Sequence, residues 1–337
     1  MMNEPDNQNK STTPQPRDVV REPKGDSSKN REGRSKFRFS MRTLLIIVTL
    51  LCVLLVPLSV SLYQARLAAM QKKLAVEWVL ENGGKVSLNE SGEVIEVSLS
   101  HTQITDAGLE NLKDLISLKA LWLQETQISD AGLEHLKGLT SLTNLNLSGT
   151  QITGTGLEHL KSLTNLYLTG TQITDAGLEH LKGLTSLNYL NLRDTQIMGT
   201  GLEHLKGLTS LKSLSLYDTQ ITDEGLMHLK GLTSLNSLWL NGTQITDAGL
   251  QHLKGMTNLK TLYLNDTQIT DAGLEHLKDL TSLKSLNLHR TQITDAGLEH
   301  LKGLTSLNFL NLTGTQVTDA GVSKFKAALP KCNVGKH

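Results

Sequence analysis

The sequence predicts an α/β protein: a solenoid with a curved stack of parallel strands inside and short helices outside, following one transmembrane helix. Two observations carry this prediction. A unit of 24 residues, for example TQITDAGLEHLKGLTSLNYLNLRD at 171–194, returns in near copies from Thr102 to a truncated copy at Thr315. Ahead of these copies, residues 43–63 contain no charged side chain. Repeats that bury their apolar faces only against neighbouring repeats form one long domain, so we expect no separate globular domains.

The apolar segment 43–63, TLLIIVTLLCVLLVPLSVSLY, is long enough to cross a membrane. As a helix it would be about 32 Å long, against about 30 Å for the hydrocarbon core of a bilayer. Pro57 would bend this helix without excluding a span. Residues 1–42 are polar and poor in large apolar side chains, which predicts a disordered segment. A signal peptide cleaved near SVS at 59–61 is the alternative, but the leader and the apolar run are both too long for one.

Positively charged residues are more frequent before the apolar segment than after it. Within fifteen residues, six precede the segment and three follow it: Lys29, Arg31, Arg34, Lys36, Arg38 and Arg42, against Arg66, Lys72 and Lys73. Positively charged flanks tend to stay in the cytoplasm. We therefore expect a single-pass protein of the cytoplasmic membrane, with its N-terminus inside and its repeats outside.

Residues 64–93 are expected to cover the first repeat, because a stack of repeats needs an end that is not itself a repeat. They predict a helix to about residue 82, with Leu67, Leu74 and Trp78 among its apolar residues. The start of a hairpin follows, formed by KVSL at 85–88 and VIEVSL at 94–99.

The repeats themselves occupy residues 94–318, and residues 319–337 predict a C-terminal cap and tail. Val322, Phe325 and Leu329 mark one face of the last helix, which Pro330 ends.

Each repeat predicts one strand, a turn, one short helix and a return. LNYLNL alternates leucine with other residues, as a half-buried strand does, whereas Leu178, Leu181 and Leu184 are spaced as on one helical face. Thr174 or Asp175 can cap the start of that helix. Strands stack about 4.8 Å apart and helices about 8–10 Å apart, so the stack should bend with its strands on the inner arc.

Two irregularities interrupt the pattern. The repeat that starts at Thr150 has 21 residues; it keeps its strand, LTNLYL, so the missing L-x-x step must fall on the outer arc. The repeats from Thr150 and Thr195 carry GTG where most others carry DAG. We expect weaker outer helices in these two repeats, because they lack the aspartate that favours a helix start.

The segment LNYLNLRDTQI resembles the leucine-rich repeat core L-x-x-L-x-L-x-x-N/C-x-L, with Thr195 at the Asn/Cys position. The resemblance covers about 94–329. The tail ITDAGLEHL is similar to the cysteine-containing subfamily, best known from substrate receptors of ubiquitin ligases. Threonine replaces Asn or Cys from Thr102 to Thr315, and its hydroxyl could bond the turn backbone. RFSMRTLLIIVTLL, then a helix and GGKV, resembles the N-terminal region of bacterial membrane-anchored leucine-rich repeat proteins.

Seven aromatic residues lie between positions 102 and 314, and all seven fall between the strand leucines, on the predicted concave face. Exposed aromatics beside Asn, Ser and Thr are typical of recognition surfaces. We predict a ligand-binding face formed by these seven residues and one arginine: Trp122, Tyr167, Tyr189, Arg193, Tyr217, Trp239, Tyr263 and Phe309. The alternative is that the aromatics only pack across strands.

The sequence predicts no catalytic, cofactor or metal site. It contains no phosphate-binding glycine loop, no H-E-x-x-H and no nucleophile elbow, so we expect neither an enzyme nor a cofactor. Eight histidines form an outer column, but helices about 8–10 Å apart would not bring them to one metal ion. They are His135, His159, His180, His204, His228, His252, His276 and His300. The net charge is zero and the basic residues are scattered, which gives no reason to expect nucleic acid.

The sequence therefore predicts a membrane-anchored recognition protein that binds a protein or a glycan on its concave face. One alternative is a structural or self-associating envelope component without a dedicated ligand, which would have no use for exposed Trp122 and Trp239. A second alternative, suggested only by the resemblance, is a ubiquitin-ligase substrate receptor. Such receptors carry an F-box where this chain has a polar leader and an apolar segment. Cys332 is expected to be the only thiol outside the bilayer.

Overall fold

The computed structural model describes residues 40–336, and the chain divides into two compact units, one up to Ser59 and one from Val60 onward. The long helix α1 (Met41–Glu81) contributes to both. Its part in the first unit is exposed and contains Pro57, and by length and composition α1 is a candidate membrane span. The predicted disordered segment 1–42 lies outside the described residues, except for its last three.

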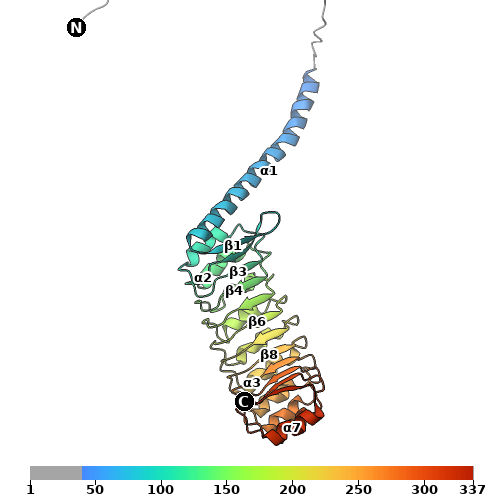
Figure 1. Cartoon of the computed structure of the whole chain (residues 1–337). Coiled ribbons are helices and arrows are strands. Elements are labelled where there is room, and N and C mark those ends of the chain that lie inside the picture. Colours follow the sequence, from blue (N-terminus) through green and yellow to red (C-terminus); the bar gives the residue numbers. More distant parts are fainter. Residues whose placement is uncertain (1–39, 337) are drawn as a thin grey trace, which may run out of the picture. The chain divides into compact units, whose positions relative to one another are not determined.

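The second unit contains a sheet of twelve strands whose order in space is their order in the chain (Figure 1). β1 pairs antiparallel with β2, and all later pairs are parallel. The predicted hairpin and parallel stack are confirmed. The strands are β1 (Lys85–Leu88), β2 (Val94–Ser98), β3 (Ala120–Trp122), β4 (Asn144–Asn146), β5 (Asn165–Tyr167), β6 (Tyr189–Asn191), β7 (Ser213–Ser215), β8 (Ser237–Trp239), β9 (Thr261–Tyr263), β10 (Ser285–Asn287), β11 (Phe309–Asn311) and β12 (Asn333–Gly335).

Short helical turns form the other side of each repeat. The predicted outer helices are present, but most are 3-10 turns or one α-helical turn that continues as a 3-10 turn. Leucines spaced by three residues fit the period of a 3-10 helix. The elements are η1 (Asp106–Leu112), α2 (Asp130–Leu133), η2 (Glu134–Leu136), η3 (Leu157–His159), η4 (Gly177–Leu181), η5 (Thr200–Leu205), α3 (Asp223–Leu226), η6 (Met227–Gly231), α4 (Asp247–Leu250), η7 (Gln251–Leu253), α5 (Asp271–Leu274), η8 (Glu275–Leu277), α6 (Leu298–Leu301) and α7 (Asp319–Ala328).

The core is a continuous column of leucine and isoleucine between the strands and the outer turns. In the repeat at 171–194 every such side chain is fully buried: Ile173, Leu178, Leu181, Leu184, Leu187, Leu190 and Leu192. Burying each of these side chains contributes about 1.5–3 kcal/mol relative to leaving it exposed, and the contribution is realised only when the next repeat is stacked.

A column of threonines, most of them buried, closes the turn after each strand. Thr195 is 5% exposed, and its hydroxyl donates to the carbonyl of Leu192 at 2.6 Å. The same bond, to the residue three positions earlier, recurs from Thr102 to Thr315. The expectation that threonine can replace Asn or Cys by bonding the turn backbone is confirmed.

The aspartate of each TDAG sequence except the last bonds the next repeat, not the helix that it begins. Asp247 accepts from the backbone N–H of Thr270 at 2.8 Å and from its hydroxyl at 2.5 Å. Thr270 in turn accepts from the backbone N–H of Ala272 and so caps its own helix. Capping by threonine is therefore confirmed in some repeats, such as those of Thr246 and Thr270. It is wrong for Thr174, because η4 has no side-chain cap, and capping by aspartate is wrong. Five other aspartates accept the same two bonds from a threonine or serine of the next repeat: Asp106, Asp130, Asp223, Asp271 and Asp295.

The glycine of TDAG makes room for this aspartate. A Cβ added at Gly273 would lie 2.3 Å from Oδ1 of Asp247, which no side chain could tolerate without movement. The two GTG repeats are different, because the first glycine of each GTG approaches the backbone of the next repeat directly. Gly199 has φ 121°, and a Cβ there would lie 2.7 Å from the Cα of Gly225. Both GTG repeats lack an α-helical turn and a side-chain cap, but so do η1 and η4, whose repeats carry DAG. The missing aspartate therefore does not account for the difference that the sequence predicted.

The three residues missing from the 21-residue repeat are lost on the outer side, as expected. Its strand β5 pairs in register with β4 and β6, while its outer element η3 is only three residues long.

The N-terminal cover is the second half of α1 with the β1–β2 hairpin. The helix continues the apolar segment and ends at Glu81, close to the predicted residue 82. Its buried residues are Ala75 and Val79, whereas Leu67 and Leu74 are 43% and 52% exposed.

The C-terminal cap is the predicted helix, α7, with Phe325 fully buried. The sequence did not predict β12, which extends the sheet beyond β11. It also did not predict that Cys332 is buried, at 3% exposed, so this thiol is not an accessible reporter of topology.

Removing one aspartate of the inter-repeat ladder should destabilise the whole array. We expect Asp247→Ala to lower the free energy of unfolding by about 1–2 kcal/mol, because two hydrogen bonds to a charged acceptor are lost. The exposed Asp279 is the matched control, and Asp279→Ala should stay within about 0.5 kcal/mol of wild type. Urea titrations of the full chain in detergent measure both. An equal loss of unfolding free energy in the two variants would mean that the bonds between repeats do not stabilise the array.

Candidate binding face

The concave face consists of three parallel rows of side chains, set by the strict register of the strands. The first and second rows are the first and third residues of each strand, and the third row lies two residues further along. Trp122, Tyr167, Trp239 and Tyr263 belong to the second row, whereas Tyr189 and Phe309 belong to the first. Arg193 and Tyr217 belong to the third row. All eight predicted site residues therefore lie on one face.

Three of the aromatic rings form a continuous patch near the N-terminal end of this face. The ring centroids of Trp122 and Tyr167 are 6.2 Å apart, and those of Tyr167 and Tyr189 are 4.9 Å apart. The indole N–H of Trp122 donates to Glu96 at 2.7 Å. Burial, and secondly the nearby Tyr167, raise the pKa of the Tyr189 hydroxyl above its ordinary value, so this hydroxyl stays protonated at neutral pH.

The remaining site residues form smaller groups. The guanidinium of Arg193 lies 4.1 Å from the ring centroid of Tyr217 and also pairs with Asp194 at 2.9 Å. Trp239 and Tyr263 meet edge to face, with centroids 6.5 Å apart. Phe309 is 37% exposed, which makes it the most exposed of these aromatic rings. The structure thus gathers the other seven predicted residues into three groups and leaves Phe309 apart from them.

Several asparagines of the face have a structural role that the sequence analysis missed. Asn146 accepts from the backbone N–H of Ser148 at 3.0 Å, and Asn191, Asn287 and Asn311 make the same bond two residues ahead. This bond satisfies a backbone donor at the end of the strand. It also turns the short Asn146 side chain toward its own backbone, which lets the rings of Trp122 and Tyr167 meet above it.

Two amide oxygens of the third row are buried without a hydrogen-bond partner among the described residues. They belong to Gln124 and Asn241, each two residues after a tryptophan of the second row, Trp122 or Trp239. A buried acceptor left unpaired costs about 1–3 kcal/mol.

Acidic side chains follow the edge of the face. In all ten repeats the residue before the turn threonine has a left-handed backbone. Four of these residues are glycine, and four of the other six are acidic. The six are His101, Glu125, Asp194, Asp218, Asp266 and Arg290. Partial burial, and next the neighbouring Asp194, raise the pKa of Asp218 above its ordinary value.

The outer histidines do not converge on one point. His159 and His180 each face a glutamate of the preceding repeat, Glu134 at 3.5 Å and Glu158 at 3.0 Å. Within residues 40–336, no group of three or more His, Cys, Asp or Glu side chains is placed to hold a metal ion.

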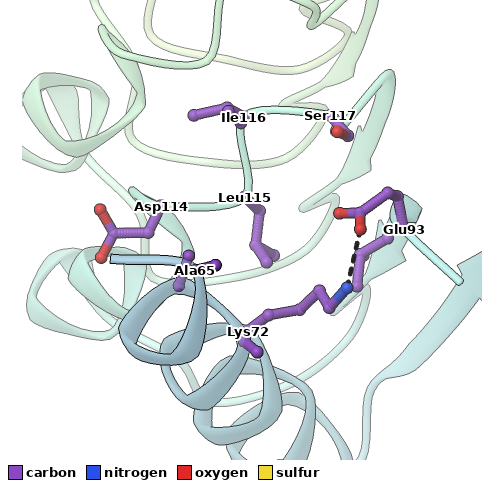
Figure 2. A pocket seen from close by; sticks show the side chains of 10 residues that line it. Ala65, Lys72, Glu93, Asp114, Leu115, Ile116 and Ser117 are labelled. Carbon is purple, nitrogen blue, oxygen red and sulfur yellow. Dashed lines mark hydrogen bonds and ion pairs between the residues drawn. The ribbon is translucent and has the colours of Figure 1, made fainter. Parts of the chain in front are cut away.

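A hollow of about 370 Å³ lies where α1 meets the first repeat (Figure 2). Ala65, with Ala68 and Ala69, forms one wall, and the loop at 114–117 forms the other. Lys72 reaches across to pair with Glu93 at 2.9 Å. Ile116 in this loop is 65% exposed, although the complete repeats downstream have threonine at its position. That departure from the repeat is the signal that could have revealed the hollow.

Neutralising Asp218 should stabilise the protein at neutral pH. Because its folded pKa is raised, the ionised carboxylate costs stability at pH 7, and this cost disappears as the pH falls through the folded pKa. Asp218→Asn should therefore unfold at a higher temperature than wild type at pH 7, with a gain of less than about 1 kcal/mol because the side chain is largely in solvent. The difference in unfolding temperature between Asp218→Asn and wild type should vanish below pH 3.8, the ordinary pKa of an aspartate.

Asp266 provides the control, since it also has a left-handed backbone but lies 3.6 Å from Arg290. Asp266→Asn should not raise the unfolding temperature at pH 7. A similar gain in both variants would mean that backbone strain, not the charge of the carboxylate, sets the effect.

Among the solved structures similar to this chain are two bacterial internalins. An internalin (inlF) from Listeria monocytogenes is 25% identical, with a TM-score of 0.42, and the match covers 74% of this chain and 91% of that chain. An internalin C2 (inlC2) from the same organism is 25% identical, with a TM-score of 0.38, and the match covers 78% of this chain and 92% of that chain. Comparison with curated proteins finds no match.

Family models of leucine-rich repeats match most of the repeat region. Residues 161–221 and 257–317 match one model described as leucine rich repeat, and residues 94–113 and 138–161 match another. Residues 209–255 match a model of two leucine rich repeats. Together these matches cover over half of the chain and agree with the buried leucine column and the parallel strands. The chain belongs to the leucine-rich repeat family.

Proposed function

We propose that this is a membrane-anchored recognition protein whose concave face binds a protein or glycan ligand and which catalyses no reaction. The observation that carries the proposal is the aromatic patch of Trp122, Tyr167 and Tyr189, continued by Arg193 on Tyr217. Solenoids of stacked repeats typically bind partners on such extended surfaces. Tryptophan, tyrosine and arginine are the residue types that contribute most to binding energy at interfaces.

The unpaired amide oxygens of Gln124 and Asn241 support the same location. Each lies two residues after a tryptophan, so a ligand that covers the ring could also bond the amide once this side chain turns outward. Peptides and sugars both combine apolar surfaces with N–H or O–H donors, and for this reason the proposal includes both classes.

The proposal places the protein in the cytoplasmic membrane through residues 43–63, with the repeats outside. It rests on the apolar, exposed first part of α1 and on the excess of positive charge before it. The resemblance of the N-terminal region to bacterial membrane-anchored leucine-rich repeat proteins points the same way.

A structural role without a ligand is the main alternative, and one observation favours it. The aromatic rings touch one another across strands, so part of their surface is already buried. A ubiquitin-ligase substrate receptor ranks last, because α1 and the hairpin precede the repeats in the described part of the chain.

Truncation of the aromatic face should abolish ligand binding without unfolding the array. We expect Trp239→Ala with Tyr263→Ala, and separately Trp122→Ala with Tyr167→Ala, to weaken binding at least about thirty-fold, as the loss of energetic hot spots does. The probes are peptides selected on the wild-type full chain from a displayed library, and a glycan array. Gln251→Ala with His252→Ala, on the outer side, is the matched control.

The outcome separates the two interpretations of the face. Lost binding with an unchanged urea midpoint supports recognition. Unchanged binding in both double variants rejects the concave site, and a collapse of the melting transition assigns the rings to packing.

A new surface cysteine should report on which side of the membrane the repeats lie. We expect Asp279→Cys, at an exposed position, to react with a membrane-impermeant maleimide as soon as the outer permeability barrier is opened. Ser28→Cys, in the leader, should react only after full permeabilisation. Buried Cys332 should contribute little in either state. The reverse pattern would place the repeats in the cytoplasm and remove the argument from charge.

A further inference from the structure

The second half of α1 has two different apolar faces. One face carries small residues toward the first repeat: Ala65, Ala68 and Ala69 line the hollow of Figure 2, and Ala75 and Val79 are buried further along. Ala75 and Val79 pack into the core, whereas Ala65, Ala68 and Ala69 are exposed at the border of the hollow.

The opposite face carries larger apolar residues that no other part of residues 40–336 buries. Tyr63 is 69% exposed, Leu67 43%, Met70 60% and Leu74 52%. At about 100° per residue these four fall within one narrow stripe, on the side of the helix opposite to the residues that face the first repeat. Four exposed large apolar residues in one stripe indicate an interaction surface.

The spacing of the stripe indicates what kind of partner covers it. Intervals of four, three and four residues between Tyr63, Leu67, Met70 and Leu74 follow the alternation of a coiled-coil seam, whose average is about 3.5 residues. Val56 and Val60 continue the same spacing toward the N-terminus, and Glu77 ends it. A second helix with the same stripe would fit this seam.

A membrane surface is a poorer occupant. Leu74 lies eleven residues beyond Tyr63, the last residue of the apolar segment, or about 16 Å along a helix. The headgroup layer of a bilayer adds only about 5–8 Å on each side of the hydrocarbon core. Lipid would therefore leave Met70 and Leu74 in water.

The charges beside the seam are compatible with two parallel copies. With Leu67 and Leu74 at a and Met70 at d, the g positions are Arg66 and Lys73. The e positions are Gln64 and Gln71, so a parallel pair brings each cation against a neutral side chain. An antiparallel pair would bring the cations of the two helices together, and a common membrane anchor also requires the parallel arrangement.

We propose that α1 pairs along the stripe of Tyr63, Leu67, Met70 and Leu74 with α1 of a second copy, as a parallel two-stranded coiled coil. The repeats lie on the other side of each helix and therefore do not obstruct the contact. Two heptads form a weak coiled coil in water, but anchoring in one membrane raises the effective concentration of the two helices. The pairing is independent of the proposed ligand site.

Disulfide crosslinking in native membranes tests this pairing. In full-length protein carrying Cys52→Ser and Cys332→Ser, we expect Leu67→Cys, Met70→Cys and Leu74→Cys to form covalent dimers on mild oxidation. Ala69→Cys is the matched control: it is solvent-accessible at the same level of the helix but lies toward the repeats. Its dimer yield should be several-fold lower.

Met70→Lys supplies the second measurement. In native membranes it should lower the dimer yield of Leu67→Cys several-fold, with an unchanged urea midpoint because Met70 is exposed. Equal dimer yields at Ala69 and Met70, or a yield at Leu67→Cys that Met70→Lys leaves unchanged, would overturn the proposal. Ligand capture by the concave face, measured in parallel, reports separately on the recognition function.

Discussion

The stacking of each repeat on the next is the constraint on which the rest of this structure depends. A single repeat cannot bury both its strand leucines and its outer leucines, so its residues are folded only between two neighbours. Two columns enforce the stacking at a constant register, the leucine core and the aspartates that reach the next repeat, while the threonine hydroxyls hold the turn within each repeat. Each column needs one residue type at one position of the repeat. The concave rows and the turn edge are the positions that remain free to vary.

Much of this arrangement could be predicted from the sequence, because leucine spacing alone separates strand from outer turn. The threonine bond was also predictable, since threonine stands where the repeat core needs a donor to its own turn. The aspartate bond was not. An aspartate at a helix start is ordinarily interpreted as a cap for that helix, and its real partner lies 23 residues away in the next repeat. The glycine two residues after each such aspartate was the available signal, because it marks the place where the carboxylate of the preceding repeat enters.

The candidate site was predicted in position but not in detail. Strand alternation places all eight site residues on the concave face, whereas ring contacts depend on side-chain directions that alternation does not specify. Asn146 illustrates the difference: its type suggested ligand contacts, yet its amide oxygen satisfies the strand end. β12 and the burial of Cys332 were missed because Asn333–Gly335 contains no leucine and follows a proline. Strand formation there is imposed by the open edge of β11, not by the residues themselves.

Pairing of α1 and recognition on the concave face would reinforce each other. A face whose aromatic rings already touch one another offers limited apolar area to each ligand, so a single site is expected to bind weakly. Two copies held by one coiled coil would present two such faces at a fixed separation, and a ligand with repeated units could engage both. The second contact then becomes intramolecular, which can raise the overall affinity by about 10²–10⁴ without any new contact. Repetitive polymers and clustered surface proteins would gain from this arrangement, whereas a monovalent ligand would not.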